Sequence, residues 1–151
     1  MKYILKSLFI GLILLGGLSS LSYAEALNDL VDQFKQATDI KRQDIQNQYF
    51  GNEISASGIV TNVEEYNFFN EKKDMVKKYY RITTDEQKTT NNTPYKLSFL
   101  SNNLSSVKDI AKGQTITKSA KIIRIADERL DISIWLYDGD ITAQEKELFE
   151  Q

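Results

Sequence analysis

The chain has 151 residues, with 19 basic and 21 acidic side chains, no cysteine and no histidine. Without histidine and cysteine it can form neither a Ser–His–Asp or Cys–His nucleophile system nor a thiolate or imidazole zinc site. No disulfide can form either, so the core alone must stabilise the fold. Only chemistry based on carboxylate, lysine or tyrosine groups remains.

The first 24 residues have the features of a signal peptide. Two lysines, Lys2 and Lys6, precede an uncharged apolar stretch over 8–21. Ser22 and Ala24 stand at the −3 and −1 positions of a cleavage site. The stretch is too short and too interrupted by Gly and Ser to favour a spanning helix. We therefore expect cleavage after Ala24, no transmembrane segment beyond it, and a periplasmic or secreted protein. An uncleaved N-terminal anchor is the alternative.

An amphipathic helix is predicted over 25–50, ending at Gly51-Asn52. Its apolar stripe recurs at steps of three and four residues. The stripe consists of Leu27, Leu30, Val31, Phe34 and Ala37, with Ile40 and Ile45 as further candidates. We expect this stripe to pack on the rest of the domain, because the polar face lacks the Lys/Arg bias of membrane-surface helices.

From Glu53 the apolar period changes to two, which is typical of strands. Three strands are predicted here, over 53–66, 78–85 and 95–101, joined by polar loops. Gly58, inside the first of them, indicates a bulge or a sharp bend.

The remaining chain predicts a helical connector, two strands and a last helix. The connector covers 102–114, the strands 115–125 and 130–138 flank a polar turn, and the helix covers 141–151. Leu130, Ile132, Ile134 and Leu136 are expected on one face of the last strand, opposite Trp135 and Tyr137. Thr142 and Glu145 fit a capping box at the start of the last helix.

This order of elements predicts a mainly β fold with flanking helices. Three strands, a short helix and two strands follow the chain order of a five-stranded OB-fold barrel, here over 51–140. An amphipathic helix would precede the barrel and a short C-terminal helix would follow it.

Two passages make the chain similar to a known group of proteins. They are "FKQATDIKRQDIQNQYFGNEISASGIVTNV" and "IAKGQTITKSAKIIRI". Over about residues 27–137 the chain resembles the exported bacterial OB-fold proteins grouped as tRNA_anti-like. Ser119-Ala120 stands where many members keep a second glycine. The resemblance implies the fold, while the group's name does not imply that an exported protein binds tRNA.

OB-folds bind ligands on the face of their second and third strands and at nearby loops. The candidate ligand-binding residues are Tyr66, Phe68, Phe69, Tyr79, Tyr80, Arg81, Tyr95 and Lys96. Aromatic side chains interleaved with Lys and Arg suit single-stranded nucleic acid or sugar ligands, because flat rings stack on them and cations pair with phosphates or acids. The alternative is that these aromatics are strand formers that pack across strands or under loops.

Trp135, the chain's single tryptophan, is a candidate interface residue. The alternative is that one of the terminal helices covers it.

The carboxylates predict no metal site and no catalytic pair, and we expect no cofactor and no catalysis. "DGD" at 138–140 lacks the further oxygen ligands of a calcium loop. The predicted function is an exported OB-fold binding module that recognises a protein or a cell-envelope glycan. Nucleic acid is expected to be an unlikely partner, because removal of the two signal-peptide lysines takes the formal charge from −2 to −4. The alternative is a structural or interaction subunit of a secretion or conjugation assembly, or an oligomeric exported OB ring.

Overall fold

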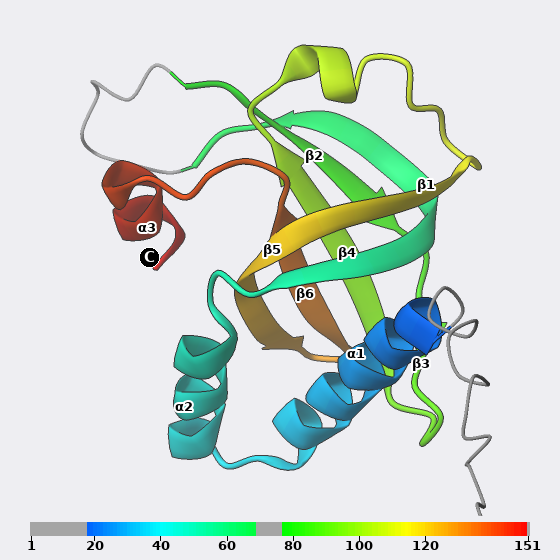
Figure 1. The fold of residues 1–151 in the computed structure, drawn as a ribbon, viewed down its shortest axis with the longest axis vertical. Helices are drawn as coiled ribbons and strands as arrows, with labels where there is room; N and C mark the ends of the chain where they lie inside the picture. Colours follow the sequence, from blue (N-terminus) through cyan, green and yellow to red (C-terminus); the bar gives the residue numbers. More distant parts are fainter. Residues whose placement is uncertain (1–17, 69–76, 151) are drawn as a thin grey trace, which may run out of the picture.

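The computed structural model describes residues 18–68 and 77–150, and it is mainly β with helices around the strands (Figure 1). The helices are α1 (Leu18–Gln36), α2 (Asp39–Tyr49) and α3 (Ala143–Phe149), with a 3₁₀ turn, η1 (Leu104–Ser106). The strands are β1 (Glu53–Tyr66), β2 (Tyr79–Thr84), β3 (Gln87–Lys88), β4 (Pro94–Ser101), β5 (Thr115–Glu128) and β6 (Asp131–Tyr137). Within the described ranges, no helix combines the length and the apolar character needed to cross a membrane.

The strands belong to one six-stranded sheet whose pairings close into a ring. The pairings lead from β1 to β2, β4, β6 and β5, and β5 pairs with β1 again. The β4–β6 pairing is parallel and the others are antiparallel. The short β3 adds to β4 outside the ring. A closed ring leaves few unpaired strand edges.

An inner core fills the ring. Alternate side chains of each strand point inward, among them Ile82, Leu97 and Ile134, and all three are almost fully buried. Helix α1 lies across one end of the strands (Figure 1). It contributes Leu27, Leu30, Val31 and Phe34 to the same core, as the apolar stripe predicts.

A second, outer cluster lies on the other face of the same strands. It consists of Tyr79, Leu100, Ile123, Trp135, Tyr137, Leu148 and Phe149. The last two side chains come from α3, which therefore covers part of the outside of the ring. Because β6 lies between the inner core and this outer layer, all seven of its residues are buried.

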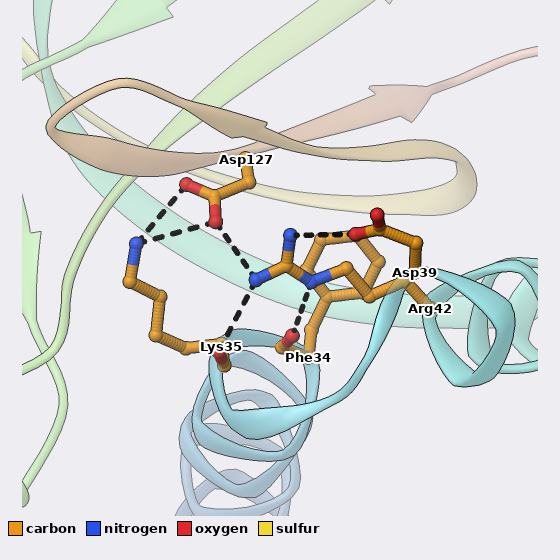
Figure 2. A network of polar contacts seen from close by, with 5 residues as sticks. All are labelled: Phe34, Lys35, Asp39, Arg42 and Asp127. Atoms are coloured by element: carbon orange, nitrogen blue, oxygen red, sulfur yellow. Dashed lines mark hydrogen bonds and ion pairs between the residues drawn. The ribbon is translucent and has the colours of Figure 1, made fainter.

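The N-terminal helix differs from the prediction, because two helices replace the one expected over 25–50. Helix α1 ends at Gln36, and Thr38 adopts an extended conformation before α2 begins. Arg42 of α2 donates hydrogen bonds to the carbonyl oxygens of Phe34 and Lys35 (Figure 2). Its side chain therefore supplies the donors that carbonyl groups in the last turn of a helix lack. Helix α1 also begins at Leu18, inside the segment predicted as a signal peptide.

Two further predictions are corrected near the ends of strands. The connector over 102–114 contains one 3₁₀ turn rather than a helix. Strand β5 continues to Glu128, so Leu130 lies in the turn and is 83% exposed instead of facing the core with Ile132. The left-handed backbone of Arg129, with φ 35°, makes this tight turn. The capping box of Thr142 and Glu145 is confirmed.

Candidate ligand-binding groove

The structure places the predicted ligand-binding residues on two sides of the ring. Tyr66, Phe68, Tyr79, Arg81 and Trp135 come together on the outside. Tyr80 and Tyr95 pack against the inner core, and Lys96 lies farther along β4. Phe69 lies outside the described residues.

Tyr95 and Lys96 have partners within the fold. The Tyr95 hydroxyl donates to Gln87 Oε1 at 3.1 Å, and burial, with the nearby charge of Asp85, raises its pKa. Lys96 Nζ lies 2.8 Å from Asp131 Oδ2. This hydrogen bond raises the pKa of Lys96, so the ammonium stays charged and paired.

Arg81 bridges two aromatic side chains on the outer face. Its guanidinium carbon lies 4.9 Å from the ring centre of Tyr66 and 5.1 Å from that of Trp135. The same guanidinium donates hydrogen bonds to Glu64, which neutralises its charge. Arg81 therefore holds Tyr66 over Trp135 by cation–π contacts.

These side chains form one wall of a cavity of about 200 Å³, here called the aromatic pocket. It is lined by Tyr66, Phe68, Ile123, Arg124, Trp135, Leu148 and Phe149. Trp135 is 8% exposed, and its Nε1 atom is buried without a hydrogen-bond acceptor among the described residues. Burial of an unpaired donor costs about 1–3 kcal/mol.

A β-bulge fixes the position of Arg124 beside Trp135. The β5–β6 register shifts between Ile122 and Arg124, and Arg124 then pairs directly across from Trp135. Gln46 of α2 bridges the bulge. Its Nε2 donates to the Ile123 carbonyl at 3.2 Å, and its Oε1 accepts from the Ile125 amide at 2.6 Å. Helix α2 thus stabilises the backbone that presents Arg124.

A second cavity of about 770 Å³, here called the polar groove, continues from the aromatic pocket. Its walls come from α2, β5 and α3. Arg124 and Phe149 line both cavities and so mark the junction. The groove is rich in amides and charges, with Asp39, Arg42, Gln43, Asn47, Lys146 and Glu150 along it.

Among the cations of the groove, Arg42 is engaged in a network at the α1–α2 corner (Figure 2). Its guanidinium lies 2.9 Å from Asp127 Oδ2 and 3.6 Å from Asp39 Oδ1, and Asp127 also pairs with Lys35 at 3.1 Å. These contacts join the two helices to β5.

The other two cations of the groove differ in their pairing. Lys146 of α3 lies 3.8 Å from Glu150, the residue that follows the helix. Arg124 is exposed and has neither a hydrogen bond nor an ion pair from its side chain to any residue in 18–68 or 77–150. Arg124 is therefore the groove cation that is available to an anion.

Helix α3, the other wall, is anchored by the buried carboxylate of Glu145. Its Oε1 accepts from the hydroxyls of Tyr137 and Tyr79 at 2.7 and 3.3 Å and pairs with Lys77 at 3.4 Å. Its Oε2 accepts from the amide and hydroxyl of Thr142. Burial alone would raise the pKa of Glu145, but these donors outweigh it and lower the pKa to about 2.

Burial beside this carboxylate raises the pKa of both tyrosine hydroxyls, so both remain protonated donors. The wall formed by α3 is consequently held by charge-assisted hydrogen bonds as well as by its apolar side chains.

Several residues of the groove carried no recognisable signal in the sequence. The sequence pattern places three of them, Gln43, Gln46 and Asn47, on the polar, solvated face of a helix. Only the corner between α1 and α2 turns these side chains toward β5. The sequence signal for this site was the pair Leu148 and Phe149, two adjacent apolar residues in a short capped helix, which indicates that this helix packs on the strands. In the described part of the chain, no three acidic side chains gather in a way that could hold a metal ion.

Comparisons with known proteins give little beyond this geometry. No protein-family model and no curated protein matches the chain, so the resemblance to the tRNA_anti-like group is not confirmed. Among solved structures, the chain is similar to a protein of Klebsiella pneumoniae subsp. pneumoniae MGH 78578 described as a "putative nucleic acid-binding lipoprotein". The two share 14% identity with a TM-score of 0.44, over 69% of this chain and 82% of that chain.

One prediction about partners is corrected by this comparison. The sequence predicted that nucleic acid is an unlikely partner, whereas the similar structure is described as nucleic acid-binding. The exclusion of nucleic acid is therefore withdrawn. At this TM-score the likeness assigns no ligand to this chain.

Proposed function

We propose that the chain is an exported OB-fold binding module that recognises a protein or a glycan of the cell envelope. Its ligand would bind in the polar groove and the aromatic pocket rather than on the outer face of β2 and β4. The ring of pairings with a parallel β4–β6 contact supports the OB-fold assignment. The sequence features of residues 1–24 support export. The proposal includes no catalytic step.

One observation carries the choice of site. Arg124, which is exposed and makes no side-chain hydrogen bond or ion pair with any described residue, lines both the aromatic pocket and the polar groove. The outer face of β2 and β4 has fewer side chains available to a ligand. Tyr79 and Leu100 are covered by the layer that includes α3, and Arg81 is paired with Glu64. The alternative of a structural subunit was based on Trp135 and on the helices that flank the strands, and the 8% exposure of Trp135 removes one of these two supports.

NMR mapping with ¹⁵N-labelled protein tests the site independently of the ligand's identity. Peptides and envelope glycan fragments are titrated, and amide shifts are followed. We expect any ligand to shift Gln43, Asn47 and Arg124, with smaller shifts at Arg81 and Ser98. Arg124→Ala should weaken that ligand, and Lys112→Ala, which removes an exposed charge from outside both cavities, should not. Shifts concentrated on β2 and β4, or no ligand in either class, would contradict the proposal.

A further inference from the structure

The aromatic pocket and the polar groove differ in chemistry, and the difference points to the kind of ligand. Of the seven described residues that line the aromatic pocket, six are aromatic or aliphatic, and Arg124 is the exception. A sugar ring placed there would leave most of its hydroxyls without partners, which is unfavourable in an apolar site. A hydrocarbon side chain brings no polar group of its own into the pocket. The pocket therefore favours a peptide.

The size of the aromatic pocket limits how much of a peptide it accepts. A volume of about 200 Å³ is well below the 300–1,000 Å³ typical of a site for a whole small ligand, and it suits a single large side chain. The polar groove, at about 770 Å³, has room for several further residues. A peptide would thus place one side chain in the aromatic pocket and its neighbouring residues in the polar groove, on the two sides of the junction between the cavities.

Arg124 lies at this junction and lines both cavities. An anion that it binds must therefore lie next to the apolar group that fills the aromatic pocket. The last residue of a polypeptide carries both groups on one Cα, a side chain and a carboxylate. The planar guanidinium is also matched to a carboxylate through two parallel hydrogen bonds.

We propose that the ligand is the C-terminus of another protein that ends in a bulky apolar residue. The apolar side chain occupies the aromatic pocket, and the terminal carboxylate pairs with Arg124. The preceding residues run along the polar groove, where Gln43 donates to Asn47 at 3.3 Å and the two amides keep one oxygen and one nitrogen for a peptide backbone. This assignment rests on the proposed function and adds the class of partner and its binding direction.

Synthetic peptides test the assignment, with Trp135 as the single fluorescent reporter. The probes are N-acetylated hexapeptides of Ser, Asn and Gly that end in Phe, either as the free acid or as the C-terminal amide, together with the acid ending in Ala. We expect the Phe acid to bind at least about tenfold more tightly than either of the other two, because the amide lacks the charged acceptor and Ala leaves the pocket empty.

A comparison of variants assigns the preference to Arg124. Arg124→Ala should abolish the difference between acid and amide, whereas Lys112→Ala should leave it unchanged. Equal binding of acid and amide, with the NMR shifts still in the groove, would overturn the C-terminus assignment and leave the proposed function standing. The same holds if a glycan, and no peptide, binds in an Arg124-dependent way. An oligonucleotide that binds while no peptide and no glycan does would overturn both proposals. If no probe of any class changes the Trp135 signal or the NMR spectrum, both proposals fail.

Discussion

At the scale of single residues, Glu145 shows how hydrogen bonds and one ion pair keep a buried carboxylate charged. Its carboxylate accepts hydrogen bonds or an ion pair from Tyr79, Tyr137, Lys77 and Thr142, and the side chain is 2% exposed. Because these contacts favour the charged form in the folded state, they couple the stability of the fold to pH.

The expected pH dependence follows from the depressed pKa of Glu145, about 2 against an ordinary 4.5. A carboxyl group with a lowered folded-state pKa stabilises the protein fully above about pH 4.5 and loses this contribution as the pH falls toward 2. Glu145→Gln lacks that contribution, so wild type should exceed it in unfolding free energy by on the order of 2–3 kcal/mol at neutral pH. Urea unfolding from pH 7 to pH 2 should show the two curves converging.

The control for this prediction is Glu86→Gln, since Glu86 is exposed between β2 and β3. Its curve should stay parallel to that of wild type. Parallel curves for Glu145→Gln as well would mean that Glu145 is not held as a charged acceptor.

Gly58 makes a second residue-scale prediction. A Cβ built there would lie 2.6 Å from Thr84 Cγ2 and 2.7 Å from Thr84 Cβ, which is too close for any side chain. Thr84 has little room to move, because it is 1% exposed and its hydroxyl accepts from the Leu97 amide. Gly58→Ala should therefore lower the free energy of unfolding by about 1–3 kcal/mol, and Ser57→Ala, at the exposed neighbouring position, by less. Denaturant unfolding of both variants measures this; equal losses would contradict it.

The sequence indicated that Gly58 matters but not why. A glycine inside an alternating strand predicts a bulge or a bend, and the β1–β2 register does shift close by, between Val60 and Asn62. The reason for glycine at this position is instead the close approach of Thr84, a residue of another strand. Periodicity along one strand contains no information about such contacts across strands.

At the scale of elements, the corner between α1 and α2 depends on Arg42. Its guanidinium donates to the Phe34 and Lys35 carbonyls and pairs with Asp127 and Asp39 (Figure 2). It also lies 5.5 Å from the ring centre of Phe34. One side chain thus ends the first helix, stacks on its last large apolar residue and ties the second helix to β5.

Arg42→Lys should recover little of what Arg42→Ala loses, because a single ammonium cannot reach two carbonyls and two carboxylates together. We expect Arg42→Ala to lower the unfolding free energy by on the order of 1–3 kcal/mol, and Arg42→Lys by more than half of that. Chemical denaturation of both variants measures the difference. Lys41→Ala, at the exposed neighbouring position on α2, is the control and should stay near wild type. Full rescue by lysine would show that only the charge of Arg42 matters.

The elements that the sequence predicts well are those with a strong local period. The apolar stripe of α1 and the alternation in β1, β2 and β4 rest on neighbours along the chain, and the structure has these elements close to the expected bounds. The break at Thr38 and the length of β5 were not predictable in this way. The first depends on Arg42 reaching back to α1, and the second on β6 pairing as far as Glu128.

The binding site was still harder to predict, because it is made by contacts between distant elements. Tyr80 and Arg81 are neighbours in the sequence, yet one faces the inner core and the other stacks on Trp135 outside it. Assignment of a strand does not reveal which face is inside. Equally, nothing local shows that α2 and α3 approach β5 from two sides and leave a groove at Arg124.

At the scale of the whole molecule, the ring carries apolar layers on both faces. The inner core joins the strands to α1, whereas the outer cluster joins the same strands to α3. No residue of α3 belongs to the inner core. The inner core therefore does not depend on contacts with α3. We expect the ring of strands to remain folded when α3 is removed from the outer cluster.

Removal of residues 141–151 tests this separation. The truncated chain loses Leu148, Phe149 and Glu145, so Trp135 loses part of its cover and the hydroxyls of Tyr79 and Tyr137 lose their acceptor. We expect Trp135 emission to shift to longer wavelength and acrylamide quenching to increase, while the strand signal in far-UV circular dichroism persists. A chain that ends at Phe149 is the control and should resemble wild type. Loss of the strand signal would mean that the outer layer is needed for the ring to close, and an unchanged emission would mean that α3 does not protect Trp135.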